Sequence, residues 1–266
     1  MRGAVLGDPI AHSLSPRLYA AGAGISDFSK IKVSAGELAD FLEKAGTKWD
    51  GFAVTMPLKR EAFNCADMAD DLAQKVQVVN TLICQPLGKS QMFIGFNTDI
   101  GGIVNAITEI APNRSYKKAL ILGSGATASS ALAALAQLEV AKIEVCARRL
   151  AGPRTVFTTA HNLGVSLSTH LLAAAPKRIQ NTDLLISTLP AGVADEIAAQ
   201  IIGTDLTGKF LLDVAYDPYP SRLVTAWQAA GGNVIPGKLM LLHQAILQMR
   251  LFTGKDPDVE QMRQIL

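Results

Sequence analysis

Short hydrophobic stretches typical of strands are mixed irregularly with helical segments in the first part of the chain, up to about Asn97. Ser15, followed by Pro16, predicts the N-cap of the first helix. Proline and glycine at 86–88 separate two hydrophobic runs and predict a hairpin at a sheet edge. The pattern predicts strands over 3–7, 28–34, 51–55, 79–84 and 92–96, and helices over 15–22 and 37–45.

From Asp99 onward, helical and strand patterns alternate regularly. This alternation is typical of a doubly wound parallel sheet. Two helical segments, 239–252 and 259–266, end the chain with no strand after them, so we expect them to pack back on the first domain. The pattern predicts strands over 119–122, 143–146, 184–187, 210–214 and 233–235, and helices over 126–138, 155–162, 195–202 and 221–229.

These patterns predict an α/β protein of two domains. Residues 1–98, completed by 238–266, are expected to form an N-terminal α/β domain. Residues 99–237 are expected to form a Rossmann-type doubly wound domain that binds a dinucleotide. A cleft between two such domains is the usual place for a small-molecule site.

Composition narrows the classes of partner. The 266 residues are 49% hydrophobic and 18% charged, with a net charge of +2, which argues against a nucleic-acid surface. The three cysteines have no metal-ligand spacing, so we expect no metal and a reducing, cytoplasmic setting. We see no signal peptide, and glycines interrupt the uncharged stretch 119–138, so no membrane span is expected. A monomer and a homodimer both remain open.

A glycine turn lies between the hydrophobic run 119–122 and a helical segment. Such a strand, turn and helix start can hold a dinucleotide pyrophosphate on backbone N–H groups at the positive end of the helix. Gly123 permits the turn, and Gly125 lets the backbone approach a phosphate without a Cβ in the way. The predicted cofactor loop is Gly123, Ser124, Gly125, Ala126, Thr127 and Ala128.

The second strand of the predicted dinucleotide fold ends in arginine and not in an acid. NAD-binding folds commonly place a carboxylate at this tip to grip the ribose hydroxyls. Here the strand ends in Ala147, Arg148 and Arg149, while Glu144 lies in mid-strand and should not reach the ribose. Guanidinium groups bind phosphate bidentately, so the tip favours NADP over NAD. A pair of solvated loop arginines is the alternative.

Polar side chains follow several short strands of the first domain, where α/β sites usually assemble. Ser13 and Ser15 could bind a carboxylate together, and Lys59 and Asp99 could hold a substrate hydroxyl and move its proton. Each residue alone has a simpler explanation: Ser15 and Asp99 as helix N-caps, and Lys59 as a surface lysine. These separate explanations do not account for the occurrence of all these residues together with a cofactor loop.

At the level of motifs the sequence resembles the shikimate dehydrogenases. The matching motifs occur in the family's order and cover nearly the whole chain. They are Gly7-Asp8-Pro9-Ile10-Ala11-His12-Ser13-Leu14-Ser15-Pro16, Val54-Thr55-Met56-Pro57-Leu58-Lys59, Val79-Asn80-Thr81-Leu82, Gly95-Phe96-Asn97-Thr98-Asp99, Ser187-Thr188-Leu189-Pro190, Tyr216-Asp217-Pro218 and Gly237-Lys238-Leu239-Met240-Leu241-Leu242-His243-Gln244-Ala245.

The resemblance implies an NADP-dependent oxidoreductase that reversibly reduces 3-dehydroshikimate to shikimate, a step of chorismate and aromatic amino acid biosynthesis. It implies Lys59 and Asp99 as the catalytic pair. Residues implied to bind the substrate are Ser13, Ser15, Thr55, Lys59, Asn80, Asp99, Tyr216 and Gln244. Residues implied to bind NADP, beyond the glycine loop, are Arg148, Arg149, Thr188, Val214, Gly237 and Met240, the last three near the nicotinamide.

One departure from the family pattern concerns the cofactor. Arg148 matches the family's adenosine-phosphate motif, but the second arginine is displaced to Arg149 or Arg154. The strength of the NADP preference is therefore open, and an NAD-dependent quinate/shikimate dehydrogenase is the first alternative. A non-catalytic dinucleotide-binding regulator and a folate-linked dehydrogenase are the others; the paired serines and Gln244 have no evident use in the latter.

Overall fold

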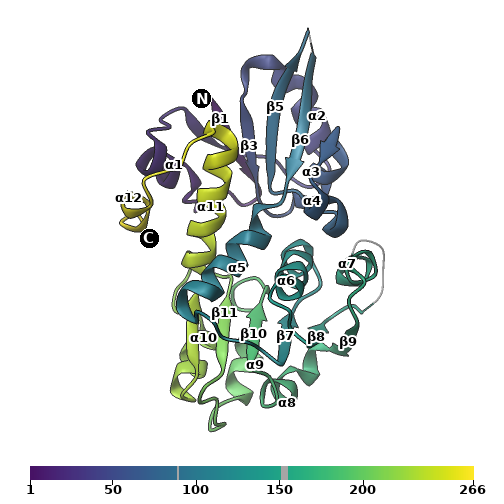
Figure 1. The fold of residues 1–266 in the computed structure, drawn as a ribbon, viewed down its shortest axis with the longest axis vertical. Helices are drawn as coiled ribbons and strands as arrows, with labels where there is room; N and C mark the ends of the chain where they lie inside the picture. The colour runs from purple at the N-terminus through teal and green to yellow at the C-terminus, as the bar shows by residue number, and fades with distance from the viewer. Residues whose placement is uncertain (89, 151–154) are drawn as a thin grey trace. The chain divides into compact units, whose positions relative to one another are not determined.

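The computed structural model describes residues 1–88, 90–150 and 155–266. Contacts between residues divide the chain into two compact units. Unit 1 contains Met1–Gly102 together with Leu242–Leu266, and unit 2 contains Ile103–Leu241. The chain therefore leaves unit 1, builds unit 2 and returns, and both chain ends belong to unit 1 (Figure 1).

Within the described residues, unit 1 contains a mixed sheet of six strands. They are β1 (Gly3–Gly7), β2 (Phe28–Lys32), β3 (Gly51–Val54), β4 (Met68–Ala69), β5 (Thr81–Leu87) and β6 (Ser90–Phe96), in the order β2-β1-β3-β5-β6-β4. β1 runs parallel to β2 and β3, whereas β5 is antiparallel to β3 and β6. Because β1 and β3 are parallel neighbours, the loops that follow them meet at the same end of the sheet, where the carboxyl ends of these strands lie.

Helix α2 of unit 1 buries one hydrophobic face. Leu38, Leu42 and Ala45 recur at spacings of four and three residues, so they form a stripe on one side of their helix that joins Phe52 of β3 in the core. The helical elements are α1 (Ser15–Ala23), α2 (Leu38–Ala45), η1 (Gly46–Lys48), α3 (Lys59–Cys65), α4 (Asp71–Val76), the first residues of α5 (Thr98–Ile110), the later part of α11 (Gly237–Thr253) and α12 (Val259–Arg263).

The predicted hairpin exists, but its predicted place at a sheet edge is wrong. β5 and β6 pair from Thr81 and Phe96 up to Leu87 and Ser90. The two-residue strand β4 then pairs with the outer side of β6 and takes the edge. Two residues are too short to give an alternating pattern, which explains why the sequence did not predict β4.

Unit 2 contains a parallel sheet of six strands within its described residues. They are β7 (Lys118–Leu122), β8 (Lys142–Ala147), β9 (Leu167–Leu171), β10 (Leu184–Ser187), β11 (Phe210–Asp213) and β12 (Asn233–Pro236), in the order β12-β11-β10-β7-β8-β9. The chain builds outward from β7 to β9, then returns to β10 on the other side of β7. This reversal between β7 and β10 is the topological switch point at which doubly wound sheets bind ligands.

Helices cover both faces of the unit 2 sheet. Leu120, Leu185 and Leu211 point to the face covered by α8, α9 and α10, where the fully buried Trp227 completes the core. α6, which follows β7, has a run of buried alanine and serine side chains, and these small residues let it lie close to its neighbours. The helical elements are α6 (Ala126–Gln137), α7 (Val156–Leu163), η2 (Leu172–Ala174), α8 (Ala175–Ile179), α9 (Asp195–Gln200) and α10 (Arg222–Ala229), with the later part of α5 and the start of α11.

Glu144 lies in the middle of β8 and forms ion pairs with cationic side chains of unit 2. Its carboxylate is 3.1 Å from Lys118 Nζ, 3.6 Å from Lys142 Nζ and 3.7 Å from a guanidinium nitrogen of Arg178. Burial alone would raise the pKa of this carboxyl, but the Lys118 hydrogen bond and the three cations together hold the pKa below its usual value. The side chain is therefore engaged inside the unit.

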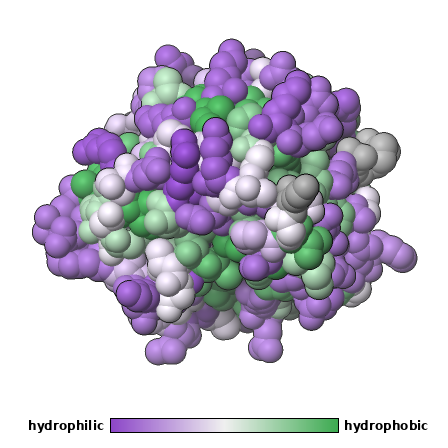
Figure 2. Space-filling model, turned by 90° about the horizontal axis from the view of Figure 1, so that it is seen from above, coloured by the Kyte–Doolittle hydropathy of each residue, from purple (hydrophilic) through white to green (hydrophobic). Residues whose placement is uncertain are grey.

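The uncharged stretch 119–138 is not one continuous helix. It consists of most of β7, the glycine turn and α6 with the residue after it. Among the described residues, no helix is both long and hydrophobic enough to cross a membrane. On the face shown in Figure 2, hydrophilic residues form most of the surface, and hydrophobic residues lie in smaller areas between them.

Candidate active site

Lys59 and Asp99 meet in unit 1. Lys59 is the first residue of α3 and follows β3 after a turn in which the Leu58 N–H donates to the Thr55 carbonyl oxygen at 2.9 Å. Asp99 lies in the first turn of α5. Lys59 Nζ donates to Asp99 Oδ2 at 2.6 Å, and the two side chains are 13% and 4% exposed. Lys59 is therefore not an ordinary surface lysine.

The two N-cap explanations are wrong. Asn97 precedes α5, and its Oδ1 accepts the Ile100 N–H at 3.3 Å, so Asn97 caps that helix and Asp99 does not. At α1 the N-cap position is occupied by Leu14, and Ser15 is the first helical residue. No side chain caps the start of this helix. Both polar side chains are thus available for roles other than capping.

Asn80 orients Asp99 from the other side. It lies just before β5 and not inside the strand, contrary to the sequence prediction. The Thr98 backbone N–H, which can only donate, lies 2.9 Å from Asn80 Oδ1 and so fixes which end of the amide is oxygen. Asn80 Nδ2 then donates to Asp99 Oδ1 at 2.9 Å. Asp99 is held through both oxygens, one by an amide and one by an ammonium group.

Of the remaining predicted substrate residues of unit 1, Gln244 contacts this group, and the other three follow strands β1 and β3. Ser13 and Ser15 follow β1, and Thr55 follows β3, so all three lie at the edge where these parallel strands end. The Thr55 N–H donates to the Leu6 carbonyl oxygen at 2.9 Å, and the Ser15 N–H approaches Ser13 Oγ at 3.4 Å. Gln244 on α11 accepts from Asn80 Nδ2 through Oε1 at 3.4 Å. The sequence prediction missed Thr81 and Gln248, which join the same network.

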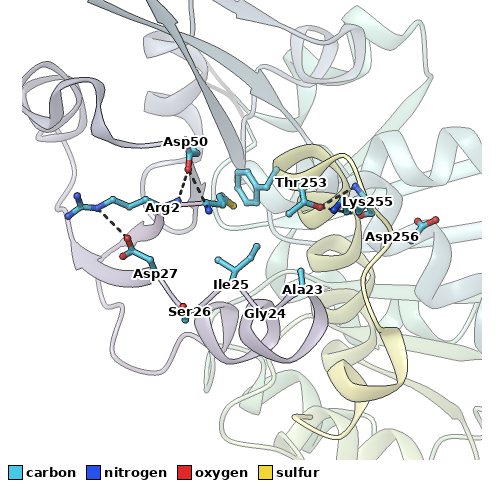
Figure 3. Close-up of a pocket in the computed structure, with 12 residues that line it drawn as sticks. Arg2, Ala23, Gly24, Ile25, Ser26, Asp27, Asp50, Thr253, Lys255 and Asp256 are labelled. Carbon is cyan, nitrogen blue, oxygen red and sulfur yellow. Dashed lines mark hydrogen bonds and ion pairs between the residues drawn. The ribbon is translucent and has the colours of Figure 1, made fainter.

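A pocket at the opposite end of this sheet, where the parallel strands begin, contains none of the predicted site residues (Figure 3). Arg2, Asp27 and Asp50 line it, and each directly precedes a parallel strand, β1, β2 or β3. Arg2 Nε lies 3.7 Å from Asp27 Oδ2, and the Arg2 backbone N–H donates to Asp50 Oδ2 at 2.6 Å. These side chains are exposed, so their ion pairs contribute little to stability.

The glycine turn of unit 2 has the geometry expected for a pyrophosphate loop. Gly123 has φ of +109°, which disfavours any side chain, and a Cβ there would lie 2.5 Å from Thr188 Oγ1. Gly125 is the N-cap residue of α6, and a Cβ there would meet no described atom within 4 Å. Ala126, Thr127 and Ala128 form the first turn of α6, whose N–H groups are free of intrahelical partners. Thr188, after β10, donates to the Leu122 carbonyl oxygen at 2.7 Å, which places it at the switch point.

Arg148 and Arg149 follow the end of β8 and are exposed. Ser124 Oγ lies 3.4 Å from the Arg149 carbonyl oxygen, so the arginine segment is next to the glycine turn. This is the strand tip at which the sequence predicts binding of a 2′-phosphate. Arg154, the other candidate for the displaced arginine, lies outside the described residues.

The residues expected near the nicotinamide gather at the end of β11. A Cβ on Gly237 would lie 2.4 Å from the Asp213 carbonyl oxygen, so the start of α11 packs directly against the backbone at Asp213 and Val214. Met240, three residues further along α11, is buried. Tyr216 follows in the same segment after β11, and burial raises the pKa of its hydroxyl, which keeps it a neutral donor.

Comparison with curated proteins identifies the family. The NADP(+)-dependent shikimate dehydrogenase of Leptospira interrogans is 30% identical to the chain over 269 aligned residues, which cover 96% of this chain and 90% of that protein. The chain belongs to the shikimate dehydrogenase family. The family, the NADP-dependent oxidoreductase class and the two-domain α/β fold that the motifs predict are confirmed.

Two shikimate dehydrogenase family models match segments that lie almost wholly in unit 1. The model of the shikimate dehydrogenase substrate-binding domain matches residues 5–82, and that of the shikimate 5'-dehydrogenase C-terminal domain matches residues 239–266. The first region contains Ser13, Ser15, Thr55, Lys59 and Asn80. The second contains the two glutamines of α11 that contact the Asn80 segment.

Solved shikimate dehydrogenases share the fold over the full chain. The crystal structure of the Mycobacterium tuberculosis shikimate dehydrogenase matches with a TM-score of 0.82 and 36% identity, covering 99% of this chain and 97% of that one. A shikimate 5-dehydrogenase from Thermus thermophilus, solved in complex with NADP(H) and shikimate, matches with a TM-score of 0.81 and 26% identity, covering 100% of both chains.

Proposed function

We propose that Lys59 and Asp99 form the proton relay of this shikimate dehydrogenase, which reduces 3-dehydroshikimate reversibly to shikimate with NADPH. The observation that carries the proposal is the shielded contact of 2.6 Å between Lys59 Nζ and Asp99 Oδ2, held in place by the Asn80 amide. A proton relay needs this type of pair, because the ammonium group can donate a proton while the carboxylate holds the ammonium group in position.

The chain's own residues handle the proton. NADPH, when bound, supplies the hydride that goes to the carbonyl carbon of 3-dehydroshikimate. Lys59 Nζ donates a proton to the carbonyl oxygen as the negative charge develops there, so the C=O group becomes the C–OH group of shikimate. Asp99 accepts a hydrogen bond from Lys59 throughout and keeps the ammonium aimed at that oxygen. In the oxidative direction Lys59 takes the hydroxyl proton.

The other polar residues fit the substrate's remaining groups. Ser13 and Ser15 follow β1 beside the first turn of α1, where hydroxyl and backbone N–H donors can bind the carboxylate. Thr55, Asn80 and Gln244 offer the mixed donors and acceptors that ring hydroxyls require. Tyr216 is proposed to close the carboxylate side.

The cofactor residues fit NADP. The open space beside Gly125 leaves room for a pyrophosphate against the first turn of α6. Thr188 lines the same switch point, and Val214, Gly237 and Met240 provide a surface for the nicotinamide at the end of β11. With Glu144 engaged inside the sheet and two arginines at the tip of β8, the site favours a ribose 2′-phosphate.

Initial rates with shikimate or quinate, each with NADP or NAD, test the proposal. We expect fast turnover with shikimate and NADP and slow turnover in the other pairings. Comparable rates with quinate and NAD would keep the fold and the proton relay but contradict the role of Arg148. Folded protein that turns over no pairing would favour the non-catalytic regulator.

Arg148→Ala is expected to weaken the preference for NADP. The loss of one charge-assisted phosphate contact should raise the KM for NADP by about 10- to 100-fold. The KM for NAD should hardly change, because NAD carries no 2′-phosphate. The ratio of kcat/KM values for the two cofactors measures the effect, and Arg149→Ala in parallel shows which arginine contributes more. An unchanged ratio in both variants would contradict the assignment.

The proposal includes neither a nucleic-acid partner nor a membrane, and it is compatible with a monomer or a homodimer. A cytoplasmic location is part of it. Cys65, Cys84 and Cys146 are free thiols, as is usual in a reducing compartment.

A further inference from the structure

Gln248 is a buried amide that neither the resemblance nor the proposed reaction uses. It lies on α11 one turn after Gln244 and is 2% exposed. Its Nε2 lies 2.9 Å from the Asn80 carbonyl oxygen and 2.9 Å from Thr81 Oγ1. A buried amide is costly unless its groups are hydrogen bonded, and this one is satisfied by the segment that carries Asn80.

The chemistry of the partners fixes the orientation of Gln248. A backbone carbonyl can only accept, so the amide must turn its NH2 group toward Asn80 and its oxygen the other way. That oxygen contacts the Tyr19 hydroxyl, which must therefore donate. Tyr19 is fully buried, and burial raises the pKa of its hydroxyl, so it remains a neutral donor.

The orientation is passed on through Thr81. Its hydroxyl has one proton and, because it accepts from Gln248, directs that proton to Asn80 Oδ1 at 2.9 Å. Together with the Thr98 N–H, this leaves Asn80 Nδ2 to face Asp99 Oδ1. Asp99 Oδ2 remains for Lys59. A continuous line of hydrogen bonds thus runs from Tyr19 to Lys59 within unit 1.

We infer that Gln248, supported by Tyr19 and acting through Thr81, is a positioning residue that sets the geometry of the Lys59–Asp99 pair. The inference rests on the proposed function, because it assigns Gln248 a part in the same proton relay.

Gln248→Met tests the inference, since methionine has a similar length and no amide. We expect kcat for shikimate oxidation to fall about tenfold, because the catalytic pair loses a fixed direction. The KM for shikimate and for NADP should stay within about twofold, because substrate contacts are kept. Leu42→Ala, a core substitution in unit 1 outside the network, is the control for lost stability and should keep its kcat at a temperature where the protein is folded.

A second pair of variants covers the case in which Gln248→Met does not fold. Thr81→Val and Tyr19→Phe each remove one hydroxyl of the line with little change in shape, and both should lower kcat in the same way. Tyr116→Phe is the matched control, because the buried Tyr116 hydroxyl has no hydrogen-bond partner among the described residues. Its kcat should not change.

The Lys59→Ala background separates positioning from a general structural effect. If Gln248 acts through Lys59, Gln248→Met should cause no further loss of kcat once Lys59 is absent. An equal further loss in that background, or an unchanged kcat in the single variants, would overturn the inference while wild-type turnover keeps the proposed function. Absence of wild-type turnover would overturn the proposed function, and the inference with it.

Discussion

Lys59→Ala is expected to lower kcat for shikimate oxidation by about 10²- to 10⁴-fold, the usual contribution of a positioned acid–base group. The KM for shikimate should change little, because the serines and the amides proposed to hold the substrate remain. The measurement is initial-rate kinetics at saturating NADP. The physical reason is that Lys59 Nζ, which lies 2.6 Å from Asp99 Oδ2, is the group proposed to exchange the proton.

Two further measurements sharpen this result. Lys44→Ala, which removes an exposed lysine from α2 of the same unit, should leave kcat unchanged. A small primary amine added to Lys59→Ala should restore part of the rate, because it can occupy the empty space beside Asp99. If Lys59→Ala keeps the wild-type kcat, Lys59 is not part of the mechanism.

Gly125→Ala is expected to impair NADP binding without loss of stability. An added Cβ meets no described atom within 4 Å, so the fold accepts it. The same Cβ would point into the space proposed for the pyrophosphate, where the backbone must come close to the phosphate oxygens. We expect the Kd for NADPH to rise at least about tenfold, measured by fluorescence titration, because one fully blocked contact is worth about that much.

Gly123→Ala provides the contrast. Its φ of +109° and the distance of 2.5 Å from an added Cβ to Thr188 Oγ1 strain the folded chain itself, so both Tm and NADPH affinity should fall. Gly125→Ala should show the loss of affinity alone. Equal NADPH affinity in Gly125→Ala and the wild type would place the pyrophosphate elsewhere.

Regular elements of unit 2 could be predicted because their signals are local. Each of β7, β10 and β11 is a short hydrophobic run, and α6 follows a glycine turn. β9 was missed because its residues are partly exposed and alternate poorly, so only pairing with β8 defines it. Its existence depends on tertiary contacts, which a single sequence does not display.

In the candidate site, too, some features have a local sequence signal and others depend on tertiary contacts. Motifs indicated which residues of unit 1 matter, and the structure brings Lys59, Asp99, Asn80 and Gln244 into one network. The role of Asn97 as the cap of α5 could have been read from an asparagine just before the helix. Gln248 gave no such signal, because a glutamine on a helix is ordinary until the structure shows that it is buried.

During synthesis, residues 1–102 leave the ribosome long before residues 242–266, while unit 2 is continuous and its residues all precede the later part of α11. Gln244 and Gln248 can therefore contact Asn80 only after residues 242–266 have been synthesised. Until then Asn80 lacks two of its partners. The network around the proposed catalytic pair is therefore completed only after residues 242–266 have been made and have packed on unit 1.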